Sequence, residues 1–240
     1  MMEKKIPGGL MIVFGGTDGT GKNTESQFAE KWFKGQGYAV AKFAFPRYGS
    51  PAGWFVAAYL GKLPDHTPPR YGPPNDVPPK IASEFYALDR YDASFEIRQA
   101  LQDGKVVICD RYVESNAGHQ GGKISDSEER KKYVDELFDR EYGFYGIPRP
   151  DINIILWLPP ELVEQRIVHR GTPQGHEVDP KHMINAGRSY RWLTETYPDF
   201  ILVECSDKNG ENLSVEAVDA KVEAILRRVL DSKLENVKNS

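Results

Sequence analysis

The chain has 240 residues, 40% hydrophobic and 28% charged, and its 35 acidic and 31 basic residues give a formal net charge of −4. This length predicts one domain with a good-sized core. The acidic balance argues against a broad basic face for nucleic acid, and no apolar run approaches the ~20 residues that span a membrane. The first apolar stretch is too short for a secretory signal, and two cysteines give no disulfide framework, so we expect a cytoplasmic protein.

Apolar strand patterns and helical patterns alternate along the first part of the chain. The predicted elements are a strand at 10–14, a helix at 24–34, a strand at 38–45 and a short helix at 54–60. Seven of the 17 prolines then fall between Pro64 and Pro79. This tract predicts a loop, because each proline lacks a backbone donor and restricts the residue before it.

The alternation continues to the end of the chain. The predicted elements are helix 80–102, strand 105–110, surface helix 127–141, strand 152–158, helix 159–170, helix 181–196, strand 200–205 and helix 215–230. The residues after 230 are polar and are expected to fray. Apolar strands alternating with helices predict an α/β domain over 1–235, with a parallel sheet covered on both faces, followed by a polar tail at 236–240. Ligands of such a sheet bind at the carboxyl ends of its strands.

A glycine-rich segment lies between the first predicted strand and the first predicted helix. Gly16, Gly21 and Lys22 have the G-x-x-x-x-G-K spacing of a Walker A loop, in which backbone N–H groups wrap phosphates and the lysine reaches the β- and γ-phosphates. Asn23 occupies the position where Ser or Thr usually binds Mg²⁺, so we expect indirect metal contact here. The predicted ATP-binding residues of this segment are Gly16, Thr17, Asp18, Gly19, Thr20, Gly21, Lys22, Asn23 and Thr24.

Five motifs in one order resemble the thymidylate kinase family of nucleoside monophosphate kinases. They are GTDGTGK, FPRYG, FYALDR, DRYVESNAGHQG and GIPRPD, spread over residues 16–151. The resemblance implies a P-loop NTPase-like three-layer α/β/α sandwich with a five-stranded parallel sheet and a LID segment. It also implies a homodimer that uses ATP and Mg²⁺ and transfers a phosphoryl group to dTMP, giving dTDP and ADP.

The resemblance assigns the charged residues to phosphates and metal. Asp110, at the end of a predicted buried strand, would hold Mg²⁺, with water between them. Arg111 and Arg47 would grip the acceptor phosphate with their planar forks, and Asp18 matches an acidic residue near the acceptor. The LID is expected at about 166–181, where Arg166 and Arg170 are the candidates for ATP binding and catalysis.

The acceptor base is expected on one helix. Tyr86 and Arg90 are four residues apart and therefore share a helix face; by resemblance the first stacks on the pyrimidine and the second donates to its carbonyl. Asn116 would read the base and Gln120 would assist. The remaining predicted acceptor contacts are Phe45, Tyr48, Ser115 and His119.

Two departures from the family pattern keep other functions open. His119 stands where the family has Tyr and Gly118 where it has Ala, which leaves room for another acceptor such as dUMP or a deoxynucleoside. Asn23 and a LID poor in arginine leave room for a nucleotide-binding module with little catalysis. We interpret three further histidines, His169, His176 and His182, as solvated loop residues, because their spacing is not a zinc pattern.

Overall fold

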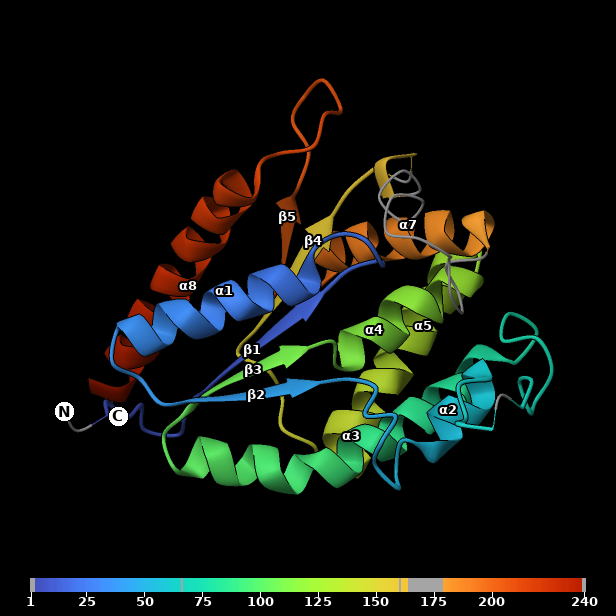
Figure 1. Cartoon of the computed structure of the whole chain (residues 1–240), viewed down its shortest axis with the longest axis horizontal. Helices are drawn as coiled ribbons and strands as arrows, with labels where there is room; N and C mark the ends of the chain where they lie inside the picture. The colour runs from blue at the N-terminus through green and yellow to red at the C-terminus, as the bar shows by residue number, and fades with distance from the viewer. Residues whose placement is uncertain (1–2, 66, 160, 164–178, 239–240) are drawn as a thin grey trace.

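The computed structural model describes residues 3–65, 67–159, 161–163 and 179–238. Five parallel strands form one sheet in the order β2-β3-β1-β4-β5 (Figure 1). The strands are β1 Leu10–Gly15, β2 Val40–Ala44, β3 Val106–Asp110, β4 Ile152–Trp157 and β5 Phe200–Glu204. The predicted α/β class and five-stranded parallel sheet are therefore confirmed.

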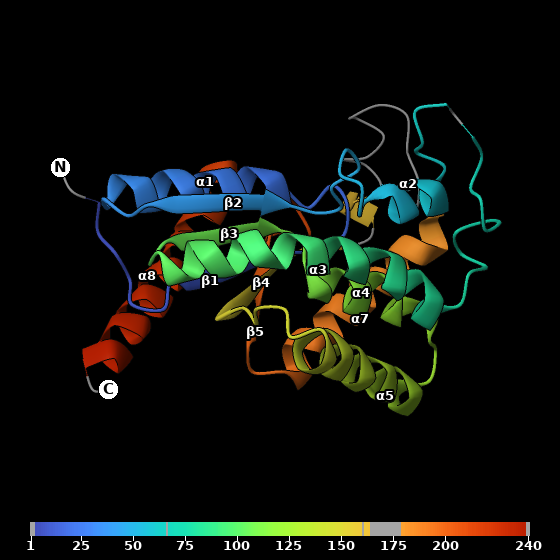
Figure 2. The same ribbon diagram turned by 90° about the horizontal axis from the view of Figure 1, so that it is seen from below.

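Helices cover both faces of the sheet. Figure 2 shows α1 on one side of the strands and α3 and α5 on the other. The helices are α1 Lys22–Gly35, α2 Trp54–Leu60, α3 Pro79–Gln102, α4 Val113–His119, α5 Ser127–Phe138, α7 Pro180–Thr196 and α8 Val215–Lys238, with short segments η1 Gly121–Lys123 and η2 Asp139–Phe144. Within the described residues, no helix is both long and apolar enough to cross a membrane.

The alternation of side chains along β1 divides the core into two layers. Leu10, Ile12 and Phe14 pack in one apolar cluster with α1 and α8. Met11 and Val13 pack in a second cluster with α3, α4, α5 and α7. All five side chains are fully buried, as expected for a parallel strand covered on both faces.

The strand register brings three loops to one edge of the sheet. Phe14 in β1 is paired with Asp110 in β3, which in turn is paired with Ala44 in β2. The chain leaves β1 toward β2 on one side and later crosses to β4 on the other. Such a reversal of strand order leaves a crevice at the carboxyl ends, where ligands bind.

The proline-rich tract is a loop, as predicted, and it is anchored at its second half. The Pro74 carbonyl accepts hydrogen bonds from Tyr59 Oη and from Lys123 Nζ, each at 2.8 Å. Asn75 Nδ2 donates to Asp179 Oδ2 at 2.6 Å. The loop therefore connects α2, η1 and the start of α7.

The closing helix is longer than predicted. We expected residues after 230 to fray, but α8 continues to Lys238. Leu234 packs against the core and Lys233 Nζ donates to Asp151 Oδ1 at 2.7 Å. These two contacts hold the last turns on the sheet, so the prediction of fraying was wrong for the residues up to Lys238.

The helix predicted at 127–141 ends as an α-helix at Phe138 and continues as the π-helical segment η2. The wider turn of a π-helix changes which side chains face inward. Glu141, expected on a charged surface helix, is fully buried in η2.

Candidate active site

The loop between β1 and α1 is shaped by glycine. Gly16 has φ 131°, and a Cβ atom there would lie 2.3 Å from the Leu156 carbonyl oxygen in β4. Gly21 is the N-cap of α1 with φ 99°, and no side chain caps the first turn. The loop can thus pass close to β4 and leave the N–H groups at the start of α1 for an anion.

Lys22 lies inside this loop. Its side chain is buried, Nζ donates to the Thr17 carbonyl at 2.7 Å, and Nζ is 3.6 Å from Asp18 Oδ1. Burial and the nearby Arg111 lower the pKa of Lys22 to about 8, although Asp18 and Asp110 oppose the shift. A bound phosphate would supply the negative charge that this lysine lacks.

Arg111 follows β3 and faces the phosphate loop. Among the described residues it is the one non-glycine residue with positive φ, at 68°, and its backbone N–H is held by the Phe14 carbonyl at 2.9 Å. The guanidinium forms an ion pair with Asp18 and lies 3.4 Å from the Gly16 carbonyl oxygen. Burial disfavours its charge, but Asp18 and other anionic neighbours outweigh this and raise the pKa of Arg111.

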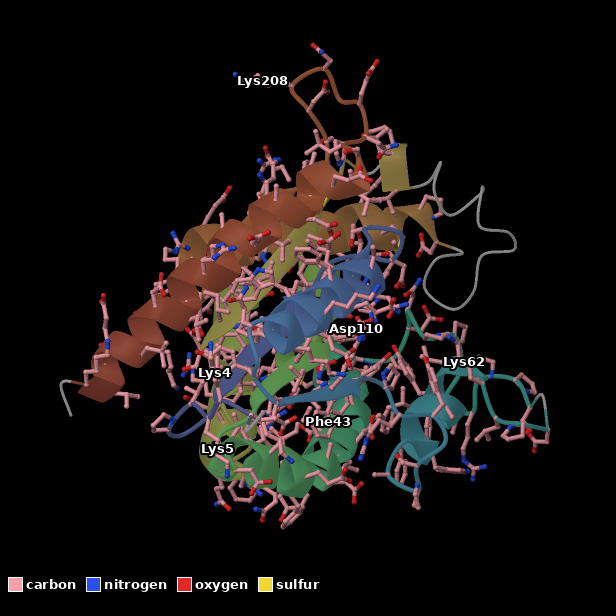
Figure 3. The ribbon with its side chains drawn as sticks, turned by 60° about the vertical axis from the view of Figure 1, so that its left-hand side comes forward. Lys4, Lys5, Phe43, Lys62, Asp110 and Lys208 are labelled. Atoms are coloured by element: carbon pink, nitrogen blue, oxygen red, sulfur yellow. The ribbon has the colours of Figure 1, made fainter. Side chains whose placement is uncertain are left out.

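Asp110 stands at the carboxyl end of β3, on the side of the sheet where α1 begins (Figure 3). Its side chain is half-buried. Asn23, by contrast, is exposed, and its Oδ1 accepts from Gln27 Nε2 at 3.1 Å. The Asp110 side chain is thus at the carboxyl edge of the sheet, whereas Asn23 Oδ1 is engaged on the outer surface of α1.

Arg47, predicted to bind the acceptor phosphate, is fixed by α3. Its Nε donates to Asp89 Oδ1 at 2.8 Å and its Nη2 to Asp92 Oδ2 at 2.6 Å. The Arg47 backbone N–H also donates to Asp89 Oδ2 at 2.7 Å. Within the described part of the chain, Nη1 of Arg47 donates to no acceptor.

Arg90 is deeply buried in a bidentate ion pair. Its Nε and Nη2 donate to the two carboxylate oxygens of Glu141, each at 2.6 Å, and Nη1 donates to the Tyr112 carbonyl at 3.2 Å. The exposed fractions of the two side chains are 1% and 0%. A guanidinium has five N–H groups, so these three bonds leave two N–H groups for another acceptor.

The other predicted acceptor residues surround Tyr86 and α4. The ring of Tyr86 meets the ring of Tyr59 edge to face at a centroid distance of 6.1 Å. Asn116 Nδ2 donates to the Ser83 carbonyl at 3.1 Å, and Gln120 is buried with no partner for its Oε1 among the described residues. Phe45 is buried beside Tyr112, Tyr48 is 39% exposed, and the Ser115 hydroxyl donates to Glu114.

Glu114 is a site residue that the sequence analysis missed. It is fully buried, and its oxygens accept from the Tyr112 N–H at 2.6 Å and from Ser115 Oγ at 2.8 Å. Gly15 allows its close approach, because a Cβ there would lie 2.7 Å from Glu114 Cγ. Burial raises the pKa of Glu114 to about 7, against the opposing effects of Ser115 and Arg111. The only signal in the sequence was a carboxylate in the otherwise uncharged segment YVESNAG.

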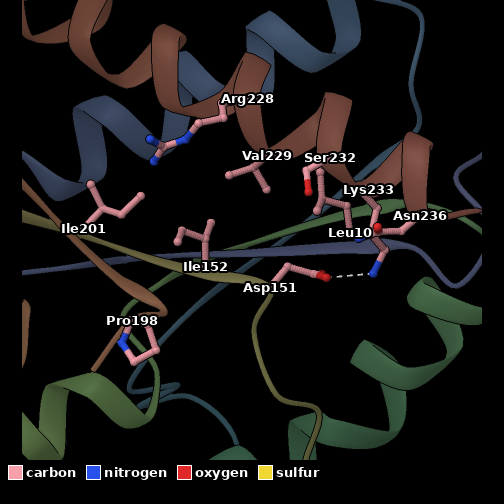
Figure 4. Close-up of a pocket in the computed structure, with 10 residues that line it drawn as sticks. All are labelled: Leu10, Asp151, Ile152, Pro198, Ile201, Arg228, Val229, Ser232, Lys233 and Asn236. Carbon is pink, nitrogen blue, oxygen red and sulfur yellow. Dashed lines mark hydrogen bonds and ion pairs between the residues drawn. The ribbon is translucent and has the colours of Figure 1, made fainter. Parts of the chain in front are cut away.

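Four of the residues considered in the sequence lie outside the described part of the chain, and Asp151 lies away from this site. Arg166, Arg170, His169 and His176 lie outside the described residues. Asp151 lies at the opposite edge of the sheet, where Oδ2 accepts from the Met11 N–H at 2.8 Å. A cavity of about 380 Å³ opens beside it, between the sheet and α8 (Figure 4). This cavity is far from the phosphate loop and contains none of the predicted site residues.

The fold and the site together define a P-loop kinase of the nucleoside monophosphate class. The family model of thymidylate kinase matches residues 14–213, so the chain belongs to the thymidylate kinase family. It is an enzyme that converts dTMP to dTDP in dTTP synthesis, and the family uses ATP as the donor.

Individual relatives agree with the family assignment. A thymidylate kinase of Mycobacterium tuberculosis is 30% identical over 161 residues, covering 65% of this chain and 70% of the relative. One from Caldicellulosiruptor saccharolyticus is 27% identical over 94% of this chain and 98% of its own. A solved thymidylate kinase from Candida albicans, 18% identical, superposes with a TM-score of 0.71 over 94% and 93% of the two chains, which supports the fold.

Proposed function

We propose that phosphoryl transfer takes place between the phosphate loop and Arg111. The observation that carries this proposal is the convergence of Lys22, Asp18 and Arg111 at one edge of the sheet, with 3.6 Å from Lys22 Nζ to Asp18 and an ion pair from Asp18 to Arg111. Two anionic substrates can approach each other only where cations neutralise both. The loop would hold the ATP phosphates and Arg111 the phosphate of dTMP.

The reaction follows from this arrangement. An oxygen of the dTMP phosphate attacks the γ-phosphorus of ATP, a new P–O bond forms, and the bond from the γ-phosphorus to the β,γ-bridging oxygen breaks, giving dTDP and ADP. Lys22 Nζ releases the Thr17 carbonyl and donates to the donor phosphates instead. Asp18 orients Arg111, and Arg47 adds its Nη1 to the acceptor phosphate.

The acceptor base would lie between α3 and α4. Tyr86 supplies an aromatic face, the two remaining N–H groups of Arg90 donate to a carbonyl, and the buried Oε1 of Gln120 is an acceptor for an N–H of the ligand. Asn116, Phe45, Tyr48, Ser115 and His119 complete the proposed pocket.

The donor set at the sheet edge fits Mg²⁺, which prefers carboxylate oxygen and water. Asp110 would hold the ion. When bound, Mg²⁺ neutralises charge on the donor phosphates. The LID at 166–181, with Arg166 and Arg170, remains part of the proposal on the basis of motif order.

Two substitutions test the assignment of donor and acceptor sides. Lys22→Ala should abolish turnover while leaving the fold intact. Arg111→Ala should weaken dTMP binding far more than ATP binding, measured by calorimetry on each ligand. Near-normal turnover of Lys22→Ala, or an ATP-specific defect of Arg111→Ala, would contradict the assignment.

We also propose a homodimer through α3. Four of its apolar side chains are exposed by 41–59%. They are Ile81, Leu88, Tyr91 and Phe95, at spacings of seven, three and four residues, which form one stripe along the helix. A stripe of this kind on a single long helix is suited to pairing with its own copy about a two-fold axis. Light scattering should show a dimer that Phe95→Asp dissociates, whereas Phe144→Asp, at an 83% exposed site on η2, should not.

A cytoplasmic location is proposed from the thiols. Cys109 and Cys205 are both buried, and they belong to different core layers, so they form no disulfide with each other. A protein whose two thiols are not joined to each other is suited to a reducing compartment.

A further inference from the structure

A chain of hydrogen bonds leads from the phosphate loop to α7 through two histidines. Arg111 pairs with Asp18 on one side, and its Nη1 lies 3.2 Å from His119 Nε2 on the other. His119 Nδ1 in turn lies 3.2 Å from His182 Nε2. His182 was interpreted from the sequence as a solvated loop residue, but it is 5% exposed in the first turn of α7.

The chemistry of arginine fixes the direction of this chain. A guanidinium has donors only, so His119 Nε2 accepts from Arg111 and carries no proton. The proton of neutral His119 is therefore on Nδ1, from which it is donated to His182 Nε2. His182 accepts there and carries its own proton on Nδ1.

The two rings form an in-line hydrogen bond and not a face-to-face stack. Their planes are 9° apart and their centroids are 5.5 Å apart, while the bonded nitrogens are 3.2 Å apart. The difference between these distances is about two ring radii, so both nitrogens lie close to the line between the ring centres. The edge-to-face contact of His119 with Tyr190, at a centroid distance of 5.6 Å, holds the first ring in this orientation.

The surroundings of His182 keep its imidazole neutral. Among the described residues, the charged and titratable groups around the two rings include Lys123 from η1, Asp179 at the N-cap of α7, Asp18 from the phosphate loop, Arg111 and Tyr190. Burial and then Lys123 lower the pKa of His182 to about 4, against Asp179 and Asp18. A protonated ring would place an N–H against another N–H and break the chain.

The place of His182 is itself fixed by the backbone. Asp179 Oδ1 accepts from the N–H groups of Lys181 and His182, at 3.0 and 3.2 Å, as the N-cap of α7. The same carboxylate also accepts from Asn75 in the proline-rich loop. His182 is therefore a rigid anchor at the far end of the chain.

We propose that His182 is a positioning residue for the acceptor phosphate, acting through His119 on Arg111. The other partners of the Arg111 guanidinium, Asp18 on Nη2 and the Gly16 carbonyl on Nη1, both belong to the phosphate loop. His119 in α4 also binds Nη1, so the guanidinium is held between the phosphate loop and α4. This inference rests on the proposed role of Arg111 in binding the phosphate of dTMP.

The test compares two substitutions that differ in one acceptor atom. The Oε1 of a glutamine is as many bonds from Cα as His Nε2, so His182→Gln keeps an acceptor for His119 Nδ1–H, whereas His182→Met has similar bulk and none. Binding of dTMP and of thymidine is measured by calorimetry on each variant. Because the histidines act on the phosphate grip, His182→Met should weaken dTMP binding about 3- to 10-fold, the effect of one hydrogen bond, and leave thymidine binding unchanged. His182→Gln should stay within about two-fold of the parent for both.

Each other outcome overturns the proposal. Equal losses in both variants, or equal losses for dTMP and thymidine, would assign His182 to packing. No loss in His182→Met would show that the chain does not position Arg111. If Arg111→Ala itself leaves dTMP binding intact, the proposed role of Arg111 fails, independently of His182.

A measurement on the parent protein needs no folded variant. Nitrogen-15 NMR of histidine-labelled enzyme should show His119 and His182 neutral at pH 7, each with its proton on Nδ1. A proton on Nε2 of either ring would contradict the direction of the chain.

Discussion

Gly118 in α4 lies directly against the ring of Tyr190 in α7. A Cβ atom on Gly118 would come 2.4 Å from Tyr190 Cζ and 2.5–2.6 Å from the two neighbouring ring carbons. The absence of a side chain at this position allows α4 and α7 to pack with the fully buried tyrosine between them. His119, the residue after Gly118, contacts the same tyrosine ring and is within hydrogen-bond distance of His182 in the first turn of α7.

Gly118→Ala should therefore destabilise the protein by about 1–3 kcal/mol through overpacking. Urea unfolding measures the effect, and a Tyr190→Leu background should reduce it because the ring is gone. Gly35→Ala at the end of α1 is the control, since nothing lies within 4 Å of its Cβ position. Equal effects at the two glycines would show that the helices adjust to the added methyl.

Removing Glu141 should be costly because Arg90 would keep an unpaired charge in the core. Both side chains are almost inaccessible to water, and breaking such a pair from one side costs about 3–5 kcal/mol. Chemical unfolding of Glu141→Ala measures this loss. Glu204→Ala removes the partner of Arg191 in an exposed pair, and should cost no more than about 1 kcal/mol. A small loss for Glu141→Ala would mean that water or another anion reaches Arg90.

Because Glu25 is protonated in the folded protein, the free energy of unfolding should fall as the pH rises. Glu25 is buried in α1, and neither its Oε2 nor the Oδ1 of Asp219 in α8 has a hydrogen-bond donor among the residues that the structure describes. Burial and then Asp219 raise the pKa of Glu25 from 4.5 to about 8. The folded protein thus keeps a proton that the unfolded chain releases above about pH 4.5, so stability is lost between that pH and about 8.

Glu25→Gln removes this titration, because its amide can donate to Asp219 at every pH. The melting temperature of Glu25→Gln minus that of the parent should increase from pH 5 to pH 8.5. Glu30→Gln, on the same helix, removes a carboxyl whose pKa is lowered by Lys34, and its difference from the parent should stay constant over this range. A constant difference for Glu25→Gln would contradict the raised pKa of Glu25.

The sequence predicted the strands and the phosphate loop because their signals are local. Apolar runs of five or six residues and the spacing of Gly16, Gly21 and Lys22 need no distant partner to be recognised. The family motifs added the positions of Asp110 and Arg111, which follow directly from the end of β3.

The partners of the site residues could not be predicted, because they are far away in the chain. Arg47 is held by Asp89, 42 residues later, and Arg90 by Glu141, 51 residues later. His182 was misinterpreted because it follows a polar stretch and its partner His119 is 63 residues away. The burial of such groups depends on how α3, α4, η2 and α7 pack, which no local pattern encodes.

The most direct test of the central claim is an acceptor panel assayed with ATP. ADP formation is followed with dTMP, dUMP, dCMP, dGMP and thymidine as acceptors, with Mg²⁺ present and withheld, and with Lys22→Ala in parallel. We predict that dTMP is the preferred acceptor, that turnover requires Mg²⁺, and that Lys22→Ala gives none. Turnover of another acceptor well above that of dTMP, or tight binding of ATP and dTMP with no ADP formed, would contradict the account.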